Sequence, residues 1–238
     1  MEPDPDVPGF APSPITHPAH QGEGEVPQEM TQADIDETIA SFVRSAVSAR
    51  ELGFDGVELH GAHSYLINQF FFAVTNQRAD RYGGAFENHL TFALELITVV
   101  RAAVGPTCPI VFRFSQWKQG DFDYKLAKNP DELERFLIPL AGAGVDLFHA
   151  STRRFNDLEF EDSDLNLAGW AKKIIWLPSI TVGSVGLDAL IQRLERSEFD
   201  LVAVGRPLLS DPAWAQKLED GREDKVVAFE GKHLSLSA

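Results

Sequence analysis

Two histidines and a tyrosine that could carry out chemistry follow directly after a short apolar segment. The stretch is Val57-Glu58-Leu59-His60-Gly61-Ala62-His63-Ser64-Tyr65. Imidazole N–H groups held in fixed positions can stabilise negative charge that develops on a substrate oxygen. The same pair could instead bind a metal, which would require a third and usually a fourth ligand, or could bond to the backbone at the end of a strand. Spacing alone leaves these three interpretations open.

Tyr65 lies shortly after His63 in the same stretch. A phenol, whose pKa is about 10, can donate a proton to a developing carbanion when it is held against one. The commoner role of a tyrosine at such a position is to pack at the base of a loop. The neighbouring pair of histidines is what makes the role of proton donor worth considering.

Arg113 interrupts an otherwise apolar segment, Ile110-Val111-Phe112-Arg113-Phe114. A guanidinium inside a sheet is costly unless it meets an anionic or electron-rich partner. One candidate partner is Glu58, which the two-residue period of a strand places on the same face as His60. Another is an anionic or electron-rich group of a bound ligand. The residues by themselves favour neither partner.

Two dipeptides, Gly183-Ser184 and Gly205-Arg206, each follow directly after a predicted strand. Backbone N–H groups at such places bind phosphate, and the loops after the last two strands of barrel enzymes commonly do so. Arg206 would add positive charge. Either dipeptide alone is a weak signal, but their position on consecutive strand–helix units favours a phosphate site.

The elements that must position these residues begin with a helix. Thr31 is a suitable N-cap residue, with Asp34 three residues further on. Apolar residues then recur at helical spacing, and Gly53 is expected to end the helix before a strand over 56–59. The members of the apolar stripe are Ile35, Ile39, Phe42, Val43, Ala46 and Val47.

The same helix–strand unit recurs along the chain. Helices are predicted over 86–103, 130–142, 187–197 and 212–219, with a looser segment over 155–177. Strands are predicted over 110–114, 145–149, 179–182 and 200–204. Short apolar strands between helices indicate a parallel sheet covered by helices. The pattern allows either a doubly wound sheet or an eight-stranded barrel, and both place functional residues after the strands.

Counting the strands gives five, whereas a closed barrel needs eight. At about 30 residues per βα unit, the difference is on the order of 100 residues. We therefore predict an α/β chain with about five C-terminal βα units, strands 4–8 of a partial TIM (β/α)8 barrel, over residues 31–220. Residues 1–30 are expected to be an irregular proline-rich lead-in and 221–238 a tail. The polar loop over 76–88 is predicted to be fixed by its own salt bridges and to shape the site.

Composition narrows the class of protein. With 238 residues and 44% hydrophobic content the chain can form a large core. The longest apolar runs fall short of the roughly 18 residues needed to span a bilayer, and the acidic start is unlike a signal peptide. A soluble, cytoplasmic protein is the expectation, with no membrane partner. A net charge of −15 argues against nucleic acid, and the single Cys108 excludes an internal disulfide and a cysteine-held iron–sulfur cluster.

Several segments, in the order in which they stand, resemble the Old Yellow Enzyme family, also called the NADH:flavin oxidoreductase family. They are Glu58-Leu59-His60-Gly61-Ala62-His63-Ser64-Tyr65-Leu66, Asn68-Gln69-Phe70, Arg78-x-Asp80-x-Tyr82-Gly83-Gly84, Glu87-Asn88, Arg113-Phe114-Ser115, Thr181-Val182-Gly183 and Val204-Gly205-Arg206-Pro207. The resemblance implies an eight-stranded barrel that holds FMN on its C-terminal face. It further implies that NADH or NADPH reduces the flavin, which then passes hydride to an activated alkene.

The resemblance also implies roles for individual residues. His60 and His63 would bind the oxygen of an α,β-unsaturated carbonyl or nitro substrate, and Tyr65 would protonate its α-carbon. Arg113 would face the pyrimidine edge of the flavin. The phosphate would be held by the two dipeptides already noted, Gly183, Ser184, Gly205 and Arg206.

The chain departs from the family pattern in two places. His89 stands where the family usually has an arginine, and the first three strands of the family are not recognisable. We therefore expect a sequence truncated at its N-terminus, with weak or no retention of FMN by this chain alone. An alternative is a non-catalytic barrel fragment that acts as an assembly or interaction module and self-associates through open sheet edges.

Overall fold

The computed structural model describes residues 9–17, 25–184 and 187–231, and the chain divides into two compact units between Leu201 and Val202. Parts of the predicted lead-in (1–8 and 18–24) and of the predicted tail (232–238) lie outside the described residues. The first unit holds most of the helix–strand repeats. The second is described here by itself.

A five-stranded sheet has the order β3-β4-β5-β6-β7. The strands are β3 (Val57–Gly61), β4 (Ile110–Phe114), β5 (Leu147–Arg154), β6 (Ser179–Ser184) and β7 (Leu201–Val202). The pairs β3–β4, β4–β5 and β5–β6 are all parallel. Strand order therefore follows chain order, as successive βα units of a barrel require.

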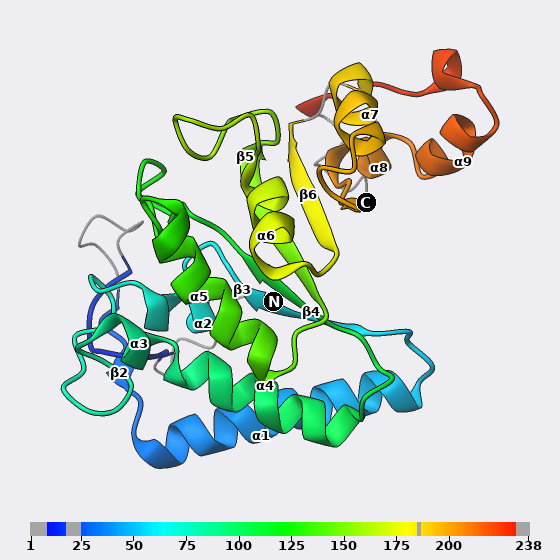
Figure 1. Ribbon diagram of the computed structural model, residues 1–238. Coiled ribbons are helices and arrows are strands. Elements are labelled where there is room, and N and C mark those ends of the chain that lie inside the picture. Colours follow the sequence, from blue (N-terminus) through cyan, green and yellow to red (C-terminus); the bar gives the residue numbers. More distant parts are fainter. Residues whose placement is uncertain (1–8, 18–24, 185–186, 232–238) are drawn as a thin grey trace. The chain divides into compact units, whose positions relative to one another are not determined.

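Helices precede the strands and cover one face of the sheet in the first unit (Figure 1). Neighbouring helices pack side by side in chain order, α1 against α4, α4 against α5 and α5 against α6. Their bounds are α1 (Gln32–Glu51), α4 (Thr91–Val104), α5 (Pro130–Ala143) and α6 (Leu167–Ile175). The remaining elements are the helices α2 (Leu66–Phe71), α3 (Phe86–His89), α7 (Leu187–Glu195), α8 (Arg206–Ser210) and α9 (Trp214–Glu219), with a 3-10 turn over Glu223–Lys225.

Local sequence signals account for the ends of α1 and α5. Thr31 and Asp34 form a reciprocal capping box, and Gly53 takes the left-handed conformation (φ +87°) that ends the segment. Asn129 caps α5 by accepting a hydrogen bond from the Glu132 N–H at 2.9 Å, with Pro130 in the first turn. These boundaries agree with the predicted ones to within a residue or two.

The predicted helix over 86–103 is wrong in one respect, because it consists of two helices. The N–H of Leu90 bonds to the Glu87 carbonyl at 3.1 Å, a tighter three-residue turn that separates α3 from α4. The looser segment over 155–177 contains α6, and two short helices that were not predicted, α2 and α8, follow β3 and β7. The predicted strand over 200–204 is shorter, since β7 spans Leu201–Val202.

The lead-in contains regular structure that its prolines did not predict. Two short strands, β1 (Phe10–Ala11) and β2 (Gln28–Glu29), pair in parallel. Arg78 secures them by donating to the carbonyls of Pro12 at 2.9 Å and Met30 at 2.7 Å. The loop that follows α2 thus holds the start of the chain, in addition to being fixed by the predicted ion pair between Arg78 and Asp80 (2.5 Å).

The core lies between the sheet and its covering helices. Alternate strand residues, Leu59, Phe112, Phe114, Phe148 and Ala150, are buried there, and their rings meet edge-on or tilted. The two-residue period then sends the intervening side chains to the opposite face of the sheet. That face carries the polar residues considered next.

Candidate active site

Three polar residues occupy adjacent positions on neighbouring strands. His60 of β3 pairs with Arg113 of β4, which in turn pairs with His149 of β5. In-register residues of parallel strands project to the same side of a sheet. The register therefore gathers two imidazoles and a guanidinium on the face that the covering helices leave free.

The turn after β3 is shaped by two residues in the left-handed region, His63 (φ 59°) and Ser64 (φ 62°). This conformation is costly for residues other than glycine, so surrounding contacts must hold it. Asn68 does so from α2: its Oδ1 accepts from the Ser64 N–H at 2.9 Å, and its Nδ2 donates to the Gly61 carbonyl at 2.9 Å. The strained turn is what aims the ring of His63 back toward that of His60.

The three predicted catalytic residues lie together. The ring centroids of His60 and His63 are 5.3 Å apart with an interplanar angle of 83°, and the ring of Tyr65 is 5.1 Å from that of His60. Tyr65 is 57% exposed. Its hydroxyl is thus accessible to a ligand bound beside the imidazoles, and the alternative of a tyrosine packed at a loop base does not describe it.

The segment Ser115–Gln119, of which the family resemblance included only Ser115, holds this turn in place. The His63 N–H donates to Ser115 Oγ at 3.1 Å, and the ring of Trp117 stacks on the imidazole of His63 with centroids 4.3 Å apart. The N–H of Gln119 donates to Ser64 Oγ at 3.0 Å. The position of His63 is therefore fixed by main-chain and ring contacts from the loop after β4.

Lys118 of the same segment is fully buried. Its Nζ donates to Asn68 Oδ1 at 3.0 Å and lies 5.5 Å and 5.3 Å from the ring centroids of Phe72 and Tyr124. Burial lowers the pKa of Lys118 to about 7. Lysines in loops are usually solvated, so its sequence context gave no signal of this burial.

Among the described residues Arg113 bonds to a side chain other than Glu58. Its Nη2 donates to Ser151 Oγ at 3.1 Å, while its Nε is buried without a hydrogen-bond partner among the described residues. The Glu58 carboxylate instead accepts a hydrogen bond from His149 Nδ1–H at 2.7 Å. Among the described residues Arg113 and Glu58 form no ion pair, and the carboxylate is paired with His149.

Charge and burial determine the protonation of the site. Burial, followed by the positive charge of Arg113, lowers the pKa of His63 to about 4 and also lowers the pKa of His60. Burial alone would raise the pKa of Glu58, but the hydrogen bond to His149 and the nearby charges, including that of Arg113, together outweigh this and lower the pKa. At neutral pH the site therefore presents two neutral imidazoles beside a guanidinium and a carboxylate.

The predicted phosphate-binding residues fall in both units. Gly183 has φ +158°, and a Cβ there would lie 2.5 Å from the backbone nitrogen of Phe155, so close approach of β5 requires glycine. Ser184 ends β6 and pairs with Arg154; its side chain lies outside the described residues. In the second unit Gly205 and Arg206 stand at the start of α8, with the guanidinium 5.9 Å from the ring of Phe229.

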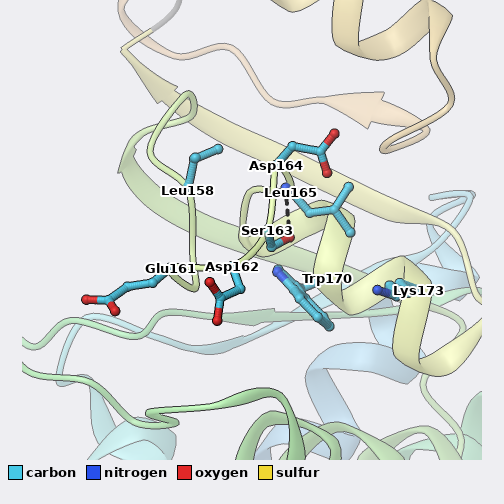
Figure 2. A pocket seen from close by; sticks show the side chains of 8 residues that line it. All are labelled: Leu158, Glu161, Asp162, Ser163, Asp164, Leu165, Trp170 and Lys173. Atoms are coloured by element: carbon cyan, nitrogen blue, oxygen red, sulfur yellow. Dashed lines mark hydrogen bonds between the residues drawn. The ribbon is translucent and has the colours of Figure 1, made fainter.

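A separate hollow of about 740 Å³ lies in the loop between β5 and α6. Figure 2 shows its side chains, among them Glu161, Asp162 and Asp164, with the indole nitrogen of Trp170 directed toward Ser163 and Asp162. None of the predicted site residues lines it. Its carboxylates would repel the phosphates of FMN or of a nicotinamide cofactor, so we do not assign it to the proposed chemistry.

Two negative findings concern the described residues. No group of three His, Cys, Asp or Glu side chains among them is arranged to hold a metal ion. In the same part of the chain no helix combines the length and the apolar character needed to cross a membrane.

Parallel βα units with polar residues at the carboxyl ends of the strands are typical of α/β enzymes. Over residues 1–225 the chain matches the model of the NADH:flavin oxidoreductase / NADH oxidase family. The chain belongs to this family. The predicted family is therefore confirmed, as are FMN and NAD(P)H as the cofactors of the family.

Individual relatives agree with this. The NADH oxidase of Thermoanaerobacter brockii is 38% identical over 212 residues, which cover 85% of this chain and 32% of the relative. The cinnamate reductase of Clostridium sporogenes is 31% identical over 241 residues, covering 91% of this chain and 35% of the relative. The chain thus spans about a third of the length of these curated relatives.

Solved structures confirm the fold class. Morphinone reductase superposes with a TM-score of 0.77 at 23% identity, over 98% of this chain and 65% of that one. The Old Yellow Enzyme homologue from Zymomonas mobilis gives 0.79 at 20% identity, over 98% and 66%. The five βα units therefore correspond to part of a larger barrel, as predicted from the strand count.

Proposed function

We propose that this chain carries part of the active site of an FMN-dependent oxidoreductase that passes hydride from NAD(P)H, through the flavin, to an activated alkene. The observation that supports it is the convergence of His60, His63 and Tyr65 at the end of β3, next to Arg113 of β4. The alkene would be conjugated to a carbonyl or nitro group, because two imidazole donors suit an electronegative oxygen.

The residues present fit a flavin. Arg113 is a permanently charged group whose buried Nε has no partner among the described residues, and the carboxylate of Glu58 is hydrogen-bonded to His149. An electron-rich ring edge would satisfy that nitrogen. When bound, FMN supplies the hydride chemistry, and Gly183, Ser184, Gly205 and Arg206 are proposed to hold its phosphate.

The imidazoles would bind and polarise the substrate. Since His60 and His63 are neutral, each carries one N–H that can donate to the carbonyl or nitro oxygen. Hydrogen bonds to this oxygen draw electron density from the conjugated alkene and stabilise the charge that develops there. The accessible hydroxyl of Tyr65 would deliver a proton to the α-carbon.

The test is a visible absorption titration of the purified chain with FMN, followed by anaerobic NADPH and then cyclohexenone. Bleaching of a bound-flavin band by NADPH and its return with cyclohexenone would support the proposal. The variant Arg113→Met should weaken FMN binding, whereas His60→Gln should leave FMN binding intact and slow only reoxidation by cyclohexenone. A chain that binds no FMN at millimolar flavin would reject it.

A second candidate function is an assembly module, and the position of β3 favours it. Among the described residues β3 is the first strand of the sheet order, with β4 on one side. An edge strand offers unpaired peptide groups to another chain. Sedimentation velocity separates the two candidates: a concentration-dependent dimer that binds no flavin supports the module, and a monomer that binds flavin opposes it.

A further inference from the structure

Ser151 contacts the ring of His63, although β5 was expected to end before it. We propose that Ser151 is a positioning residue that fixes the tautomer of His63, so that the ring presents its Nδ1–H to a substrate oxygen. This inference deepens the proposed function and rests on it only for the identity of the oxygen that is bound.

The oxygen of Ser151 accepts a hydrogen bond from Arg113. Arg113 Nη2 lies 3.1 Å from Ser151 Oγ. A guanidinium can only donate hydrogen bonds, so this contact occupies a lone pair of the serine and leaves its proton unused. The serine side chain is 2% exposed, and water is therefore a poor alternative partner for that proton.

The ring of His63 offers an acceptor for the hydroxyl proton of Ser151. His63 Nε2 lies 2.7 Å from Ser151 Oγ, and among the described residues it is the one further group in hydrogen-bond contact with this hydroxyl. A buried O–H that donates to nothing is costly. The hydroxyl of Ser151 therefore donates to Nε2, and Nε2 acts as the acceptor.

The proton of the neutral His63 ring must then lie on its other nitrogen, Nδ1. His63 is neutral at neutral pH, because burial and the charge of Arg113 lower its pKa to about 4. A neutral imidazole carries one proton, so when Nε2 accepts, Nδ1 must be protonated. The opposite tautomer would leave the serine proton without an acceptor and would turn a lone pair toward the substrate oxygen.

Other contacts fix the ring in place but leave its tautomer free. Trp117 stacks on it with an interplanar angle of 18°, and Ser115 Oγ accepts from the His63 backbone N–H. Neither contact involves a ring nitrogen. The tautomer is thus set by Ser151, and a chain of hydrogen bonds runs from Arg113 through Ser151 to His63.

The test is ¹⁵N-histidine NMR of the full chain at pH 7, because protonated and unprotonated ring nitrogens differ strongly in chemical shift. Signals are assigned with His63→Gln. In the wild-type chain His63 should be protonated at Nδ1, and Ser151→Thr should keep this pattern. Ser151→Ala should shift the tautomer ratio toward Nε2–H by roughly five- to tenfold. A wild-type His63 protonated at Nε2, or an unchanged ratio in Ser151→Ala, would overturn the inference.

Ser115→Ala is the matched control, because it removes a buried hydroxyl that bonds the backbone of His63 and not its ring. It should leave the tautomer unchanged; a shift as large as that of Ser151→Ala would overturn the specific role of Ser151. If Ser151→Ala does not fold, the wild-type and Ser151→Thr spectra still decide the tautomer. The measurement needs neither flavin nor turnover. If His63 is protonated at Nδ1 but the chain binds no FMN, the proposed function is rejected and the inference about Ser151 stands. If the chain turns over with FMN but His63 is protonated at Nε2, the inference is rejected and the proposed function stands.

Discussion

The buried ammonium of Lys118 makes a quantitative prediction about stability and pH. Its pKa is lowered by burial from an ordinary 10.5 to about 7. Below pH 7 both the folded and the unfolded chain carry the proton, and the penalty for burying the charge is complete. Between pH 7 and 10.5 only the unfolded chain keeps the proton, so the free energy of unfolding rises with pH by up to about 1.4 kcal/mol per pH unit.

The size of the effect follows from the shift. The full penalty is about 5 kcal/mol, and about 3 kcal/mol of it should be relieved between pH 7 and 9.5. The neighbouring phenol does not interfere in this range, because burial raises the pKa of Tyr124 above its ordinary 10. Lys118→Met keeps a similar side-chain length and removes the charge, together with the hydrogen bond to Asn68 Oδ1.

The assay is urea unfolding of the wild-type chain and Lys118→Met, followed by tryptophan fluorescence at pH values from 7 to 9.5. The wild-type free energy of unfolding, taken relative to that of Lys118→Met, should rise by about 3 kcal/mol over this range. Lys128→Met is the matched control, since Lys128 is an exposed lysine of the same loop region, and its difference from wild type should stay flat. A difference for Lys118→Met that is equally flat would refute the reasoning.

Three further predictions concern packing, the start of the chain and catalysis. Gly61→Ala should lower the free energy of unfolding by about 2 kcal/mol, because the new Cβ would lie 2.4 Å from the ring of Phe112. Gly142→Ala is the control: it has open space around it in α5 and should raise the free energy of unfolding by about 0.5–1 kcal/mol. Equal effects of the two substitutions in denaturant titrations would contradict this. Arg78→Met should cost about 3–5 kcal/mol, since it leaves the carbonyls of Pro12 and Met30 unpaired; a loss below about 1 kcal/mol in the same titration would show that the clamp is unimportant. Tyr65→Phe should slow reoxidation of reduced flavin by an activated alkene about 100-fold and leave reduction by NADPH unchanged, and stopped-flow rates that fall equally in both half-reactions would exclude the role of proton donor.

The architecture could be predicted because its signals are local. Thr31 with Asp34 identified the start of α1, and Gly53 its end. Alternation of apolar strands with helices identified the sheet, and the two-residue period placed His60 on the free face. Each of these predictions depends on residues that are close together in the chain, and sequence patterns are informative over such short separations.

The partners of the site residues could not be predicted, because register between strands decides them. Glu58 was a candidate partner for Arg113, but its carboxylate bonds to His149 of β5, two strands away in the sheet. Ser151 was missed because β5 was expected to end at His149, where the apolar run ends. The strand continues to Arg154, since backbone pairing with β6 does not require apolar side chains.

Burial, followed by the charge of Arg113, explains why a site built on histidines can work with neutral rings, because both disfavour a charged imidazole at His63. A histidine protonated at physiological pH would repel Arg113 and would carry a proton on both ring nitrogens, so that neither could accept from Ser151. Because the ring is kept neutral, the hydroxyl of Ser151 is enough to decide which nitrogen donates. Burial and the charge of Arg113 thus have a common effect, which is to make His63 a donor of defined direction.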